Sequence, residues 1–174
     1  MYVAECYVHH MNYEDYKLTP MALKELLVAA ATCIEYRKDE VLWKSSGLLG
    51  FPAAILLLSF VHSVGFLLKI KGTADDKGNR SVAGKSFEIV RDPHFFNPPL
   101  TITEKKKLYE LFRGYLTHQA SLADGTSLSW SKFPREKVIE KTDSNNWSLN
   151  IEVLYEACSR LYRNHESEIR SKSK

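Results

Sequence analysis

A helical pattern and a pair of polar groups meet in one stretch, Lys107-Leu108-Tyr109-Glu110-Leu111-Phe112-Arg113-Gly114-Tyr115-Leu116-Thr117-His118-Gln119. Its apolar side chains recur at the three-and-four spacing of a buried helical face, at Leu108, Leu111, Phe112, Tyr115 and Leu116. Such a face packs a helix against a core and leaves Arg113 and His118 outside it. On an α-helix these two residues stand roughly 7.5 Å apart along the axis and about 140° apart around it. Their long side chains can still converge on one ligand, so this stretch is the candidate site.

Length and composition predict a single domain, residues 1–174. Hydrophobic residues make up 44% of the chain, which is ample for a packed core. The formal charge is +3, and the excess lies in residues 101–174, which carry 13 basic and 10 acidic side chains. So small an excess favours an anionic partner only weakly, because dedicated nucleic-acid binders usually carry a denser basic patch.

The three cysteines, Cys6, Cys33 and Cys158, are odd in number, far apart and without metal-ligand spacing. We therefore expect reduced thiols in a reducing compartment and no structural disulfide. The N-terminus lacks the basic start and apolar run of a signal peptide, which favours a cytoplasmic location. The sequence shows no nucleotide-binding loop, metal-ligand cluster or catalytic triad, so it predicts no metal and no cofactor.

The first helix is expected from Pro20 to about Trp43, after a short arm of residues 1–18. Thr19-Pro20 is typical of an N-cap followed by proline in the first turn. An apolar face follows at helical spacing, formed by Leu23, Leu26, Leu27, Ala30, Ala31 and Ile34.

Residues 47–68 contain no formally charged side chain, so a membrane span must be weighed against a buried helix. Pro52 suits the first turn of a helix, which leaves a stretch shorter than the roughly twenty residues a span needs. Ser59, His62 and Ser63 form a polar stripe that fits a bundle interior better than lipid. We therefore predict a buried central helix with no membrane contact, and a single-span protein is the minority alternative. His62 is expected to be a hydrogen-bonded core histidine.

Residues 71–100 are rich in glycine, proline and aspartate and predict a long loop. A loop of this length often hides a short helix, which we place at Ser86–Arg91. His94-Phe95-Phe96 is expected to anchor the loop on the bundle.

A small β-hairpin is predicted within residues 124–142, because residues 126–130 and 137–141 alternate in polarity after a turn at Asp124-Gly125. Residues 147–150 then lead into the last helix, and the charged residues 165–174 are expected to fray. The predicted fold is therefore all-α, a helical bundle with a small hairpin between its last two main helices.

The candidate stretch resembles a known family. Arg113-Gly-Tyr-Leu-Thr-His118 is similar to the motif of HEPN domains, the higher eukaryotes and prokaryotes nucleotide-binding superfamily, in which an arginine is followed by four to six residues and a histidine. The segments around it resemble a bacterial branch of this all-helical superfamily, namely Pro93-His94-Phe95-Phe96, Leu108-Tyr109-Glu110-Leu111, Gln119 and Leu149-Asn150-Ile151. The resemblance in the order of secondary-structure elements covers about residues 20–165.

The resemblance implies a metal-independent endoribonuclease that acts as a homodimer, with a role in a toxin or phage-defence system and an antitoxin or regulatory protein as a further partner. His118 would move the proton of the attacking 2′-hydroxyl or of the leaving oxygen, and Arg113 would hold the phosphate. Lys106, Thr117 and Gln119 would contact the RNA. Two motif helices, each spanning about Thr103 to His118, would face each other through exposed aromatic residues such as Tyr109 and Tyr115.

Gly114 departs from the family pattern, because catalytic members usually carry a polar residue after the arginine, often asparagine. Either Gln119 or Thr117 substitutes for it, or the domain is a non-catalytic RNA-binding, nucleotide-binding or regulatory relative. A purely structural interpretation is also open, in which Arg113 pairs with Glu110 or Glu104 and His118 caps the helix end. The run Lys105-Lys106-Lys107 is likewise typical of a solvated helix face.

Overall fold

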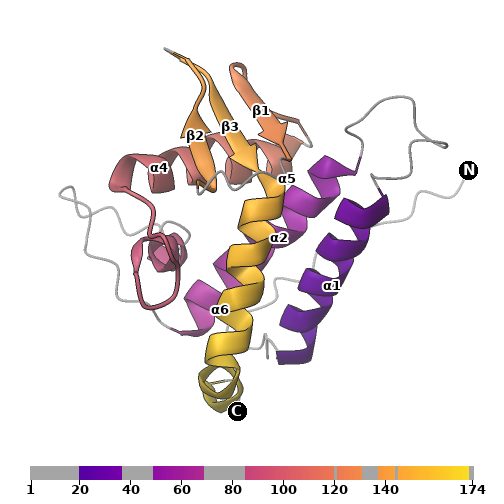
Figure 1. The fold of residues 1–174 in the computed structure, drawn as a ribbon, viewed down its shortest axis with the longest axis vertical. Helices are drawn as coiled ribbons and strands as arrows, with labels where there is room; N and C mark the ends of the chain where they lie inside the picture. The colour runs from indigo at the N-terminus through magenta and orange to yellow at the C-terminus, as the bar shows by residue number, and fades with distance from the viewer. Residues whose placement is uncertain are drawn as a thin grey trace, which may run out of the picture.

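The computed structural model describes residues 20–36, 49–68, 85–119, 121–130, 137–143 and 145–172, without the side chains of Thr117 and His118 (Figure 1). The predicted arm of residues 1–18 and the first part of the predicted loop, residues 71–84, lie outside this description. Over the described ranges the protein is mainly helical, with four helices and a small mixed sheet of three strands between the third and the last.

The first helix is α1 (Pro20–Tyr36), the second is α2 (Gly50–Leu67), and the last is α6 (Ile151–Lys172). The third helix is continuous through three parts, which are α4 (Ile102–Lys107), the π-helical segment η3 (Leu108–Gly114) and α5 (Tyr115–Gln119). A 3₁₀ turn, η2 (Phe87–Arg91), and the strands β1 (Thr126–Ser129), β2 (Ile139–Lys141) and β3 (Trp147–Asn150) complete the fold.

The core lies where α1, α2 and α6 pack against one another, with the sheet at one end of this bundle (Figure 1). The predicted apolar face of α1 is confirmed, since Leu23, Leu27, Ala30 and Ile34 are buried. The end predicted at Trp43 falls in residues 37–48, outside the described part.

Helix α2 is long and apolar enough to cross a bilayer by length and composition, and half of it is buried inside the protein. Core helices of soluble proteins share both properties, so its assignment as a buried soluble helix stays a prediction. His62 does make the expected hydrogen bond to other protein atoms, because its Nδ1 lies 2.6 Å from Ser86 Oγ.

The short helix predicted at Ser86–Arg91 is confirmed as the 3₁₀ turn η2. The predicted anchor is confirmed as well. Phe96, in the turn that follows η2, is 1% exposed and belongs to the core.

The sheet differs from the predicted hairpin. Both predicted segments contain strands, β1 and β2, but these do not pair with each other. Each pairs with β3, β1 in parallel and β2 antiparallel, so that Leu149 lies opposite Leu128 on one side and Ile139 on the other. Residues 148–150 are buried, and a buried strand must satisfy its backbone groups on both sides. The residues predicted to lead into the last helix therefore form the central strand.

The prediction that residues 165–174 fray is wrong as far as Lys172. Helix α6 bends at His165, where φ is −118° and ψ is 16°, and then continues. Ile169 beyond the bend is fully buried, and Arg170 donates to Glu166 at 2.7 Å. Burial of this apolar side chain helps to hold the last part of the helix on the bundle.

Candidate functional site

The helix that carries the candidate site begins with a capping box. Thr101 Oγ1 accepts from the Glu104 backbone N–H at 3.2 Å, and Glu104 Oε2 accepts from the Thr101 N–H at 2.8 Å. This reciprocal pair satisfies two donors of the first turn and fixes where the helix starts.

The predicted α-helical geometry is wrong between Leu108 and Gly114, where the chain is a π-helix. Its hydrogen bonds join residues five apart, so a turn is wider than in an α-helix. The buried positions are accordingly four apart, at Leu108, Phe112 and Leu116, whereas Tyr115 is 37% exposed. Such π-helical turns are rare and occur often at functional sites, and this one ends at the motif residues Arg113 and Gly114.

Arg113 lies over an aromatic ring. Its guanidinium carbon is 5.6 Å from the centroid of Tyr109, and the Tyr109 ring meets Phe87 edge to face at 5.2 Å. Of its two expected acidic partners, Glu110 forms an ion pair with Lys106 at 3.8 Å and Glu104 closes the capping box. The Tyr109 ring contacts the cationic group of Arg113 and helps to position it.

Helix α2 brings a histidine to the same region. The His62 ring lies 6.2 Å from the Phe87 ring, and its Nδ1 is held by Ser86, which is 3% exposed. Burial lowers the pKa of His62 below its usual value, and the positive charge of Arg113 lowers it further. We call His62, Ser86, Phe87, Tyr109 and Arg113 the Arg113 cluster.

The approach of α2 to η2 depends on Gly65. A Cβ at this position would stand 1.9 Å from the backbone oxygen of Ser86, which no real side chain can do. The absence of a side chain at Gly65 therefore lets the Ser86 backbone reach α2, one turn from His62.

The lowered pKa of His62 predicts a pH dependence of stability. The unfolded chain binds a proton at this ring at a higher pH than the folded chain does. The contribution of His62 to the free energy of unfolding is therefore complete above the pKa of the unfolded chain, about 6.5. It is lost as the pH falls through the lower pKa of the folded chain. Urea unfolding on both sides of this window should show a smaller loss on acidification for His62→Gln than for wild type. Equal losses in the two proteins would contradict the environment described for His62.

The remaining predicted site residues are only partly placed. His118 and Thr117 lie on α5, but their side chains are outside the described part, so the distance from His118 to Arg113 is not part of this geometry. Gln119 is exposed, and the Lys106 side chain is 67% exposed. The interpretation of the lysine run as a solvated face is wrong for Lys105, which forms an ion pair with Glu88 and is 18% exposed.

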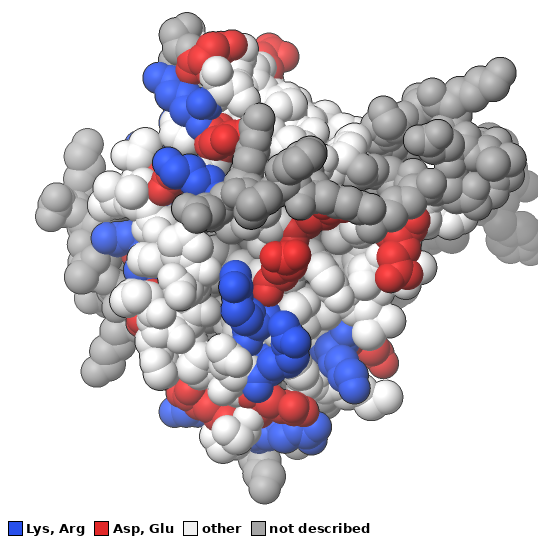
Figure 2. Space-filling view, in the orientation of Figure 1, with Lys and Arg blue, Asp and Glu red and all other residues white. Residues whose placement is uncertain are grey.

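The face shown in Figure 2 carries basic and acidic side chains interspersed, without a single broad basic patch. Helix α6 likewise carries both signs, with Arg160 and Arg163 between Glu156 and Glu166. The described residues visible on this face therefore form no extended basic track for a nucleic-acid backbone.

Sequence reasoning missed the association of His62 and Ser86 with Arg113. The available signals were a histidine inside a charge-free helix and a glycine three residues later. Neither indicates that the histidine lies near Ser86, 24 residues later, or Arg113, 51 residues later. Among the described residues, the set of three potential metal ligands close enough to share one ion is His94, His165 and Glu168, and none of these three belongs to the Arg113 cluster. Comparisons of the chain with protein-family models, curated proteins and solved structures found no match.

Proposed function

We propose that the protein is a HEPN-like, metal-independent endoribonuclease that cuts RNA by attack of the 2′-hydroxyl. The observation that supports it best is the position of Arg113, held over Tyr109 at the end of a π-helical turn inside the motif. A guanidinium that keeps its charge and is held by an aromatic ring suits a phosphate that gains negative charge in the transition state.

The division of labour follows from the chemistry of the two motif residues. Arg113 holds the phosphate through its guanidinium fork, while His118 moves the proton of the 2′-hydroxyl or of the leaving oxygen, a role that the imidazole group suits. Lys106, Thr117 and Gln119 contact the flanking RNA. The toxin or phage-defence role and an antitoxin partner belong to the family resemblance.

The active form proposed is a homodimer joined through the helix from Thr103 to His118. Of the two aromatic residues expected at its edge, Tyr109 is partly buried against Phe87, which leaves Tyr115 as the better contact. Sedimentation at micromolar concentration should give a dimer for wild type and a monomer for Tyr115→Asp. Val28→Asp, at an exposed apolar residue of α1, is the matched control and should remain dimeric. A monomeric wild type that cleaves RNA at its full rate would show that the site does not need two copies.

A non-catalytic HEPN-like module that binds RNA or a nucleotide is the second candidate, and Gly114 favours it because glycine supplies no side-chain hydrogen bond. RNA incubated with the protein in EDTA separates the two. The enzyme yields fragments with 2′,3′-cyclic phosphate ends, whereas the module binds RNA and leaves it whole. A single-span membrane protein is the third candidate, and recovery only from detergent extracts would favour it.

A further inference from the structure

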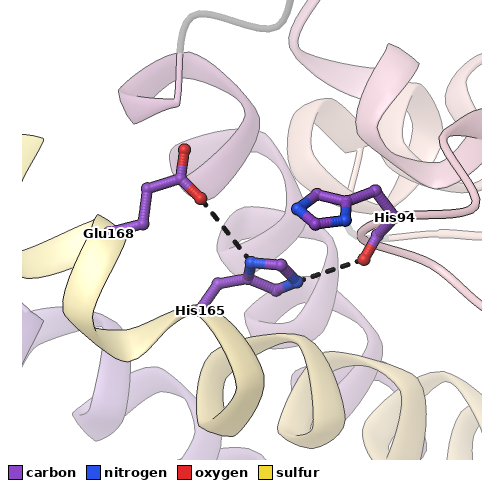
Figure 3. A group of neighbouring side chains, drawn as sticks. All are labelled: His94, His165 and Glu168. Carbon is purple, nitrogen blue, oxygen red and sulfur yellow. Dashed lines mark hydrogen bonds and ion pairs between the residues drawn. The ribbon is translucent and has the colours of Figure 1, made fainter.

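Three potential metal ligands converge where the turn after η2 meets the bend of α6. They are His94 from the turn and His165 and Glu168 from α6 (Figure 3). One ligand atom from each lies within 4.8 Å of the others. Figure 3 shows a ring nitrogen of His94 turned toward the space between His165 and the Glu168 carboxylate.

The proton on His165 is placed by its contact with the backbone. Its Nε2 lies 3.1 Å from the carbonyl oxygen of His94, and because a carbonyl only accepts, Nε2 must carry the hydrogen. In the neutral ring Nδ1 is then unprotonated and presents a lone pair. A histidine that binds metal typically donates its other ring N–H to a backbone carbonyl in this way.

The lone pair of His165 Nδ1 faces a carboxylate. Glu168 Oε2 lies 3.6 Å away, which is longer than an ordinary hydrogen bond of about 2.7–3.2 Å. Two ligands each about 2.1 Å from a tetrahedral ion stand about 3.4 Å apart. The observed separation is therefore close to that of two ligands on one cation.

The backbone that carries His94 is well fixed, while its side chain is exposed. Its N–H donates to Asp92 Oδ1 at 2.9 Å, and Phe96 is buried in the core two residues later. The Phe95 ring packs on the His165 ring at 4.7 Å between centroids. The exposed His94 ring meets the His165 ring edge to face at 4.7 Å between centroids, so the two imidazoles are already neighbours.

We propose that His94, His165 and Glu168 bind a Zn²⁺ ion that clamps the turn after η2 to the last turns of α6. Two imidazoles and one carboxylate are a ligand set that zinc takes, whereas Mg²⁺ and Ca²⁺ prefer sites made of oxygen atoms alone. Water takes the fourth position. The site shares no residue with the Arg113 cluster, so it goes beyond the proposed ribonuclease and does not depend on it.

Calorimetric titration of untagged, metal-free protein with ZnCl₂ tests the site. We expect one Zn²⁺ per chain in wild type and a higher midpoint of thermal unfolding when it is bound. His94→Ala and Glu168→Gln should each weaken binding by more than about 100-fold, since loss of an outer-shell partner alone typically costs 10–100-fold. Both variants should lose the thermal shift.

Glu166→Gln is the matched control, because it makes the same change on the same helix at a carboxylate that pairs with Arg170. It should bind Zn²⁺ as wild type does. Co²⁺ gives an independent signal, a visible absorption band expected in wild type and Glu166→Gln and absent in His94→Ala and Glu168→Gln. Failure of wild type to bind Zn²⁺, or equal binding by all four proteins, would overturn the proposal.

Discussion

Alanine at position 65 is expected to destabilise the fold by about 1–3 kcal/mol, the usual range for forcing atoms into a packed core. The added Cβ would stand 1.9 Å from the Ser86 oxygen and 2.7 Å from its carbonyl carbon. These are backbone atoms, so they cannot rotate away as a flexible side chain would. Helix α2 and η2 must separate, although alanine improves helix propensity by about 1 kcal/mol.

Gly114→Ala is the control for this prediction. Both glycines lie in helices, but only at Gly65 would an added Cβ clash with neighbouring atoms. The nearest atom to a Cβ at Gly114 is the backbone oxygen of Tyr109 at 3.7 Å, an ordinary contact. This variant should be more stable than wild type by about 0.5–1 kcal/mol, the usual penalty of glycine inside a helix. Urea unfolding measures both, and a Gly65→Ala protein as stable as Gly114→Ala would contradict the close approach of α2 to Ser86.

Alanine at His118 is expected to lower the rate of RNA cleavage by about 10²–10⁴-fold, the typical contribution of a positioned acid or base. The fold should persist, as circular dichroism and urea unfolding can show. Cleavage at the wild-type rate in this variant would remove His118 from the mechanism.

Two further variants separate the roles within the motif. Arg113→Lys keeps the positive charge but loses the guanidinium fork. Its rate of RNA cleavage should be well below that of wild type. Gly114→Asn introduces the polar residue usual in catalytic HEPN members, and a Cβ at this position would make only an ordinary contact. We expect it to cleave RNA at least as fast as wild type. A loss of cleavage in Gly114→Asn would count against the family assignment of this turn.

Much of the helical framework could be predicted because its signals are local. The apolar period of α1, the charge-free α2 and the period of α6 each lie within one segment. Helical hydrogen bonds join residues four apart, so a short window of sequence contains the whole interaction. The short η2 was expected from the length of the loop that contains it.

The sheet could not be predicted, because pairing joins residues that the local pattern does not connect. The segments that hold β1 and β2 suggested a hairpin, yet both strands pair with β3, whose buried Leu149 needs neighbours on two sides. The end of α6 was misjudged for a similar reason. Its composition is polar, and its one apolar residue after the bend, Ile169, belongs to the buried core, which local composition does not reveal.

The sequence singled out Arg113 as a candidate site residue but did not predict the geometry around it. Arg113 was chosen because it falls outside an apolar face, but buried residues spaced by four fit a π-helix as well as an α-helix. Arg113 lies over the ring of Tyr109, four residues earlier on the same helix. The neighbouring His62 comes from a helix 51 residues earlier in the chain, a distance over which sequence spacing carries no information.

Cleavage of one RNA oligonucleotide in EDTA, beside a copy with a 2′-deoxy nucleotide at the cleaved position, tests the proposed function most directly. In the proposed mechanism the 2′-hydroxyl is the nucleophile and no metal takes part. The account predicts that the RNA is cut to a 2′,3′-cyclic phosphate and that the 2′-deoxy copy stays whole at that position. Cutting of both oligonucleotides, or of neither, would contradict it.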